Sequence, residues 1–168
     1  MEASIWNIQL EDQITAPALC KKIEQECQPE LLAICSCIEQ FFSQHTANEF
    51  EDQHIELVLM LFTKLFDEIT HLFLKEKGLI YPGIQHKGAD FELLPDVVEQ
   101  IQHTQKKITA ILVRLRQLLN NFQMKPAWSA AFKNCVQHFY QLETKVHQWI
   151  YIEQNLLYPR FFHSTNIN

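Results

Sequence analysis

Apolar residues recur every three or four positions along four long stretches of the chain, the spacing of one face of a helix. Residues that begin or end helices bound these stretches, such as Thr15 before Pro17, Asn48 three places before Glu51, and Pro159. No stretch alternates apolar and polar residues as a half-buried strand does. The pattern therefore predicts an all-α chain, with helices over 15–44, 48–78, 95–119 and 126–158.

Four helices of about 25 residues, joined by connections of roughly 5 to 15 residues, pack most simply as an antiparallel up-down-up-down four-helix bundle. We expect the bundle to cover residues 14–162 and the tail at 163–168 to fray. Residues 1–13 carry several apolar side chains and read as an arm that lies on the bundle or on another subunit. This arm and a long loop from Gly83 to Leu94 are the expected partner surfaces.

Composition narrows the class of protein. The 168 residues are 47% hydrophobic and carry a formal net charge of −6, which argues against disorder and against an electrostatic nucleic-acid footprint. No apolar run approaches the roughly 20 residues that cross a bilayer, so no membrane association is expected. The chain has five cysteines, an odd number, and four of them lie in one stretch. No signal-peptide pattern precedes them. These features favour buried free thiols in a reducing compartment. We expect a cytoplasmic protein with a protein partner or self-association.

One internal repeat stands out, because E-x-x-L-[IL]-Y-P occurs at 76–82 and again at 153–159. Its glutamates, Glu76 and Glu153, continue the apolar stripes of the second and fourth helices, four residues after Leu72 and Trp149. In an up-down bundle these two helices run in the same direction across the core, so the carboxylates should face each other. A buried carboxylate must be paired, protonated or bound to metal.

The chain resembles the hemerythrin-like di-iron proteins, specifically the branch that repairs iron–sulfur clusters. The likeness covers roughly residues 12–162. Members of that family hold two irons with four histidines, one per helix, and two bridging glutamates in an H-x-x-x-E arrangement on helices two and four. The landmarks that carry the resemblance here are Gln28-Pro29-Glu30-Leu31, His54-Ile55-Glu56-Leu57, Lys75-Glu76 with its Leu-Ile-Tyr-Pro ending, Leu118-Leu119-Asn120-Asn121-Phe122, and Glu153 through Arg160.

By this resemblance the bridging glutamates are retained as Glu76 and Glu153, whereas the histidines of helices two and four fall on Leu72 and Trp149. The helix-one ligand falls on Lys21, with Cys20 and Glu24 beside it if the register slips.

On helix three, counting back from Asn120 places Gln105 at the ligand position, and counting forward from Pro95 places His103 there. We prefer Gln105 because it continues the apolar stripe, while His103 lies about 160° around the helix on the charged side.

The resemblance therefore implies a degenerate site. We expect no resident metal or other cofactor and no catalytic residue, with Lys21 bridging the two glutamates and with Gln105 and the Trp149 indole donating further hydrogen bonds. Such a chain would be a non-catalytic binding or regulatory protein related to the stress repair of iron–sulfur proteins. The vestigial site positions are Lys21, Glu68, Leu72, Glu76, Gln105, Trp149 and Glu153.

The alternative is an active di-iron protein that repairs or senses nitrosative and oxidative damage to iron–sulfur clusters. It would bind two iron ions with Glu76, Glu153 and His103, assisted by Glu68. This alternative requires His103 rather than Gln105 to face the core.

Overall fold

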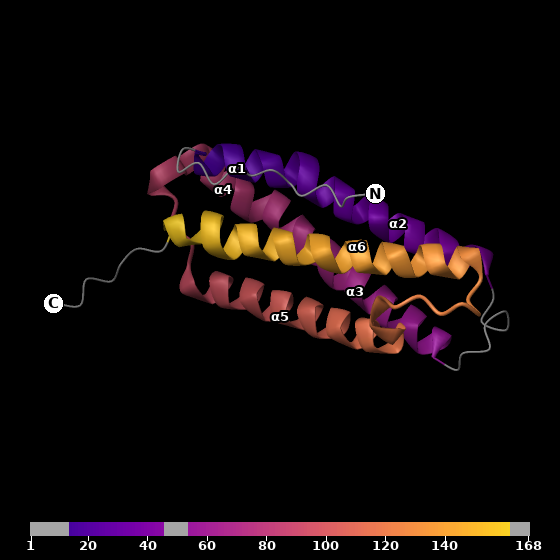
Figure 1. Ribbon diagram of the computed structural model, residues 1–168. Coiled ribbons are helices and arrows are strands. Elements are labelled where there is room, and N and C mark those ends of the chain that lie inside the picture. Colours follow the sequence, from indigo (N-terminus) through magenta and orange to yellow (C-terminus); the bar gives the residue numbers. More distant parts are fainter. Residues whose placement is uncertain (1–13, 46–53, 162–168) are drawn as a thin grey trace.

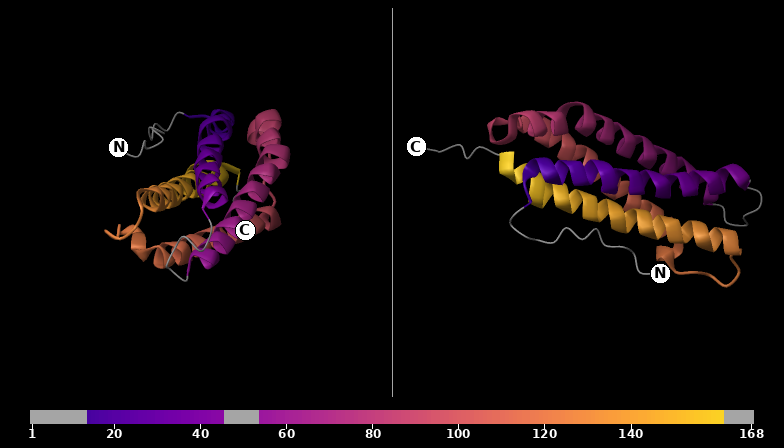
Figure 2. Two further views of the ribbon diagram at one scale, coloured as in Figure 1. Left: turned by 90° about the vertical axis from the view of Figure 1, so that its right-hand side faces the viewer. Right: turned by 90° about the horizontal axis from the view of Figure 1, so that it is seen from above.

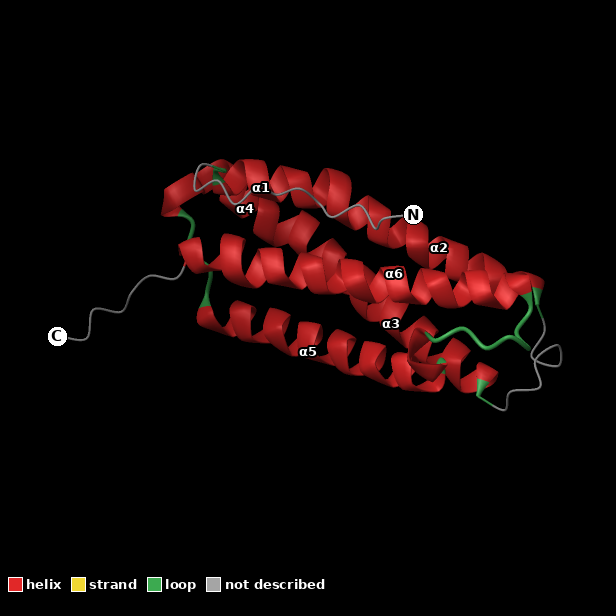
Figure 3. Ribbon diagram, in the orientation of Figure 1, coloured by secondary structure: helices red, strands yellow, loops and turns green. Residues whose placement is uncertain are grey.

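The computed structural model describes residues 14–45 and 54–161, and within these ranges the regular structure is entirely helical (Figures 1 and 3). Four long helical segments pack together around one core. None of the helices in the described ranges is both long and apolar enough to span a membrane. The elements are α1 (Ala16–Lys22), η1 (Ile23–Cys27), α2 (Gln28–Gln44), α3 (Ile55–Lys75), η3 (Glu76–Ile80), α4 (Tyr81–Lys87), η4 (Gly88–Asp90), α5 (Pro95–Leu118), η5 (Asn120–Phe122), α6 (Ala130–Ile152), η6 (Glu153–Leu157) and η7 (Tyr158–Phe161).

The ends of the first and third long segments agree with the sequence signals. Thr15 caps α1, its hydroxyl oxygen accepting from the Ala18 backbone N–H. Helix α5 begins at Pro95 and ends at Leu118, after which Asn120, Asn121 and Phe122 all have positive φ and stop the helix.

The start of α6 differs from the prediction. Ser129 caps this helix, and its hydroxyl oxygen lies 3.1 Å from the Phe132 backbone nitrogen that donates to it. Pro126 stands in the preceding turn, so the predicted start was too early because a serine cap satisfies the first-turn N–H groups, which proline cannot do. The predicted start of the second helix at Asn48 lies outside the described residues.

The predicted end of the second helix between Gly78 and Pro82 is wrong. The chain passes through the π-helical turn η3 and continues as α4 to Lys87. Pro82 is accommodated because it stands in the first turn of α4. The long loop expected from Gly83 is therefore shorter, and Gly83 lies inside α4, where an added Cβ would sit 2.3 Å from the Phe91 ring.

The long segments pack on one another mainly through two helix pairs. Helix α2 lies along α6, and α3 lies along α5, while α2 touches α3 and α5 touches α6 far less (Figures 1 and 2). The N-terminal half of the chain comprises α1 to η4, and the C-terminal half comprises α5 to η7. Each long segment therefore packs mainly on a segment from the other half. Most of the buried side chains are apolar, Cys20, Cys27, Cys35 and Cys135 among them, and the buried polar ones are Gln28, Glu76, Gln105, Glu143, Lys145 and Glu153.

Candidate functional site

Two fully buried carboxyl groups, those of Glu76 and Glu153, form the polar centre of the core. Each glutamate begins a π-helical turn, η3 and η6, and the fifth residue after it is a tyrosine whose backbone N–H donates to the glutamate carbonyl. In a regular α-helix a residue five places on would lie about 140° away around the axis. The π-turns instead bring the phenols of Tyr81 and Tyr158 onto the carboxyl pair.

Glu76 accepts hydrogen bonds at both oxygens. The Gln28 side-chain amide donates to Oε2 over 3.0 Å, and the Tyr158 hydroxyl donates to Oε1 over 3.2 Å. The Tyr81 hydroxyl also lies 3.2 Å from Oε2. This carboxyl group is thus held by donors from the first and the last long segments of the chain.

Glu153 is held in the same manner. The Gln105 amide donates to Oε2 over 2.7 Å, and the Tyr81 hydroxyl lies 2.8 Å from Oε1. Because this hydroxyl has one hydrogen, it donates to the nearer oxygen, that of Glu153. Every oxygen of the two carboxyl groups therefore has its own protein donor.

The pKa values of both carboxyl groups are raised above their ordinary value. Burial raises the pKa of Glu76 well above its ordinary value of 4.5, and the negative charge of Glu153 raises it further. Burial also raises the pKa of Glu153, but the hydrogen bond with Glu76 and the Tyr81 hydroxyl oppose that rise. The pKa of Glu76 is therefore raised further than that of Glu153, so of the two carboxyl groups Glu76 favours its protonated form more strongly.

A hydrogen-bonded chain of glutamines leads from Glu153 toward the surface between α5 and α6. Gln154 donates to the carbonyl oxygen of Gln105, and Gln102 donates to Gln154 over 3.3 Å. The side-chain amides of Gln105, Gln154 and Gln102 thus all donate in the direction of Glu153. This polarity stabilises a negative charge on Glu153.

Two buried polar atoms beside the pair have no hydrogen-bond partner among the described residues, the Gln28 carbonyl oxygen and the Trp149 indole nitrogen. The Trp149 indole was expected to donate a hydrogen bond, and the geometry does not provide one, although its proximity helps to lower the pKa of Glu153. Trp149 and Leu72 are 0% and 3% exposed, so both fill the core.

Lys21 does not bridge the two carboxyl groups, because it is exposed. In a regular helix positions 21 and 28 would share a face, but the π-turn η1 lies between them and changes the register. The turn places Cys20 inside instead, beside the carboxyl pair. Burial, together with the charges of Glu153 and Glu76, raises the pKa of the Cys20 thiol to about 12, so the thiol stays protonated.

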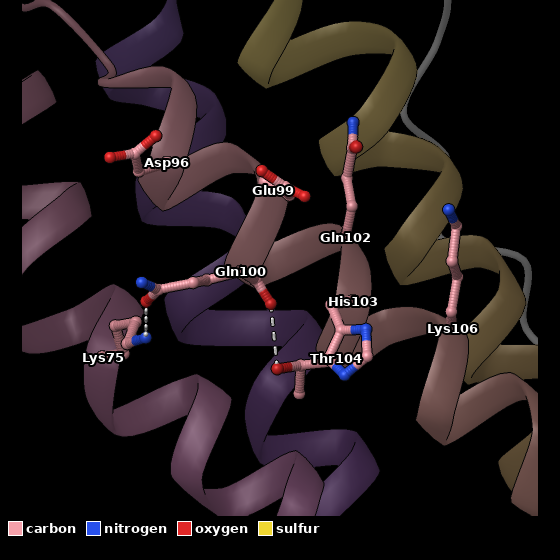
Figure 4. Close-up of a pocket in the computed structure, with 8 residues that line it drawn as sticks. All are labelled: Lys75, Asp96, Glu99, Gln100, Gln102, His103, Thr104 and Lys106. Atoms are coloured by element: carbon pink, nitrogen blue, oxygen red, sulfur yellow. Dashed lines mark hydrogen bonds between the residues drawn. The ribbon is translucent and has the colours of Figure 1, made fainter.

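Two further predicted positions lie away from the pair. Glu68 is only partly buried and faces Lys107 of α5, with 3.9 Å between their charged atoms. His103 is exposed on the outer side of α5, in a surface groove that it shares with Lys75, Glu99 and Lys106 (Figure 4). Gln105, and not His103, faces the core.

Sequence reasoning missed Gln28 and the two tyrosines as members of the site. The repeat contained a signal for the tyrosines, since each follows its glutamate by five places. Gln28 could have been found from spacing, because Gln28 precedes Glu76 by 48 positions and Gln105 precedes Glu153 by the same 48.

The donor set does not fit two irons. Iron in helical bundles takes imidazole together with carboxylate. Here the amides and phenols direct hydrogens at the carboxyl oxygens, and the indole of Trp149 fills neighbouring space. Within the described ranges, no three side chains of His, Cys, Asp or Glu come together to hold a metal ion.

Comparison of the sequence with models of known protein families and with curated proteins finds no match.

Proposed function

We propose that this chain is a non-catalytic binding or regulatory protein of hemerythrin-like ancestry, related to the stress repair of iron–sulfur proteins. Its four long segments would form an antiparallel up-down-up-down bundle. In this proposal the carboxyl pair is a structural element held by hydrogen bonds from protein side chains and by one shared proton.

One observation carries the proposal: each oxygen of Glu76 and Glu153 already has a side-chain donor. A metal ion would have to displace these donors, and the amides of Gln28 and Gln105 would then be buried without acceptors, at a cost of about 1–3 kcal/mol each. The packing of Trp149 and Leu72 supports the same conclusion, because two irons and their bridging oxygen would need the space that these side chains fill.

The test is the iron content of protein expressed in iron-supplemented medium, with a near-ultraviolet absorption spectrum. We expect no stoichiometric iron in the wild-type protein. The matched variant Gln28→His/Leu72→His/Gln105→His/Trp149→His, checked for folding by circular dichroism, should bind iron because it supplies one imidazole per long segment.

About two irons per wild-type chain, with an oxo-bridge absorption band, would overturn the proposal and favour an active di-iron repair protein. A folded four-histidine variant that stays colourless would count against the ancestry. If that variant does not fold, Gln28→His/Gln105→His keeps both large core side chains and serves in its place.

A further inference from the structure

Ion pairs join the two halves of the chain at corresponding positions. Glu30 of α2 lies 3.0 Å from the ammonium of Lys145 in α6, and Lys107 of α5 pairs with Glu68 of α3. A shift of 77 residues, which carries residue 76 onto 153, also carries 30 onto 107 and 68 onto 145. The same two positions therefore form an ion pair twice, with the signs of the charges reversed.

Both ion pairs cross between halves. The pair Glu30–Lys145 lies between α2 and α6, and the pair Glu68–Lys107 lies between α3 and α5, which are the two main packing contacts. Two hydrogen bonds that cross between the halves are alike, since the Tyr81 hydroxyl donates to Glu153 and the Tyr158 hydroxyl donates to Glu76. The hydrogen bond from Lys75 of α3 to Gln100 of α5 also crosses and has no counterpart, because positions 152 and 23 are isoleucines. At the corresponding ion-pair positions, the reversed charges distinguish one half from the other.

Like halves of two chains would meet with like charges. Two N-terminal halves would place Glu30 against Glu68, and two C-terminal halves would place Lys107 against Lys145. Lys145 is only 3% exposed, so a second ammonium beside it would be poorly screened by water. Opposite charges at these positions attract unlike halves and repel like ones.

We propose that the surface between the halves is a recognition surface that fits an N-terminal half only to a C-terminal half. The partner of each half is the unlike half of the same chain. The short link at residues 91–94 keeps that partner at a high effective concentration. This link is anchored, because the Phe91 ring packs edge-on against Phe161 with 5.6 Å between ring centroids. A second copy of the chain can pair only by exchanging unlike halves. The inference does not depend on the proposed function.

The decisive variant is Glu30→Lys/Lys107→Glu in the full chain. Within one chain, this variant places like charges in both inter-half ion pairs. Between two chains, it places opposite charges where like halves would meet. We expect its thermal unfolding midpoint to fall by roughly 8 °C. Light scattering at raised protein concentration should show a several-fold larger dimer fraction than the wild-type protein has.

The matched control adds Glu68→Lys/Lys145→Glu, which restores attraction between unlike halves with all four signs exchanged. This four-fold variant should recover the wild-type midpoint and dimer fraction. An unchanged midpoint or an unchanged dimer fraction in the double variant would overturn the proposal, and so would a four-fold variant that does not recover. If the double variant does not fold, recovery in the four-fold variant supports the proposal and its absence overturns it.

Discussion

The N-terminal and C-terminal halves bind their buried glutamates with the same residue types, but the glutamine donor has more hydrogen bonds in the C-terminal half than in the N-terminal half. The Gln105 amide donates to Glu153 while its carbonyl oxygen accepts from Gln154, so both ends of the side chain are fixed. The Gln28 amide donates to Glu76, and its carbonyl oxygen has no partner among the described residues. The better-held carboxyl group, that of Glu153, is the one whose pKa is raised less.

The halves differ again one turn before each glutamate. Leu72 in the N-terminal half corresponds to Trp149 in the C-terminal half, and the indole packs edge-on against Phe73 with ring centroids 5.0 Å apart. A large side chain from one half fills the space between both. The comparison shows that a repeated hydrogen-bonding unit can be packed asymmetrically, and the two halves should therefore respond differently to equivalent substitutions.

The largest losses of stability are expected at these packing positions. Trp149→Ala should lower the free energy of unfolding by about 4 kcal/mol, and Leu72→Ala by about 3 kcal/mol, because both leave cavities in a closed core. Urea unfolding followed by circular dichroism measures both losses. Leu79→Ala is the control, since Leu79 is 70% exposed and should change stability by less than about 0.5 kcal/mol. A loss at Trp149 no larger than this control would contradict its role in the core.

Smaller losses of stability, but a clear contrast between the halves, are expected at the two glutamines. Gln105→Leu should cost about 3 kcal/mol, because it leaves an oxygen of Glu153 without its donor and the Gln154 amide without its acceptor. Gln28→Leu should cost only about 1 kcal/mol, because the substitution also removes a buried carbonyl oxygen that has no hydrogen-bond partner among the described residues. Equal losses in the same unfolding assay would refute the asymmetry between the halves.

A further prediction concerns the pH dependence of stability, which tests whether Glu76 holds a proton in the folded state. Because the folded pKa of Glu76 is raised, the folded state binds a proton that the unfolded state has released, and stability must fall as the pH rises above about 4.5. The expected slope is about 1.4 kcal/mol per pH unit until the pH passes the folded pKa. Glu76→Gln mimics the protonated acid and should flatten this slope.

Urea midpoints measured between pH 4.5 and 9 provide the comparison, with Glu153→Gln as the matched variant. Removing the charge of Glu153 takes away one cause of the raised pKa of Glu76, so the slope should persist but end at lower pH. A wild-type slope that survives unchanged in Glu76→Gln would place the proton elsewhere.

The sequence by itself determined the four helical stretches and the matched placement of the two glutamates. Helical periodicity reflects neighbours three and four residues apart, so it can be read without knowledge of the fold. The same periodicity distinguished Gln105 on the apolar stripe from His103 on the charged side. It also identified Thr15 and Pro95 as helix starts, because caps act on the residues beside them.

Only the tertiary structure decided how the site is completed. The π-turns at 23–27, 76–80 and 153–157 alter the helical register, and the structure places Gln28 at the carboxyl pair where the resemblance pointed to Lys21. The donors to the carboxyl pair come from residues as far as 82 positions away along the chain. Such partners, and the reversed ion pairs between the halves, arise from long-range packing that no local pattern encodes.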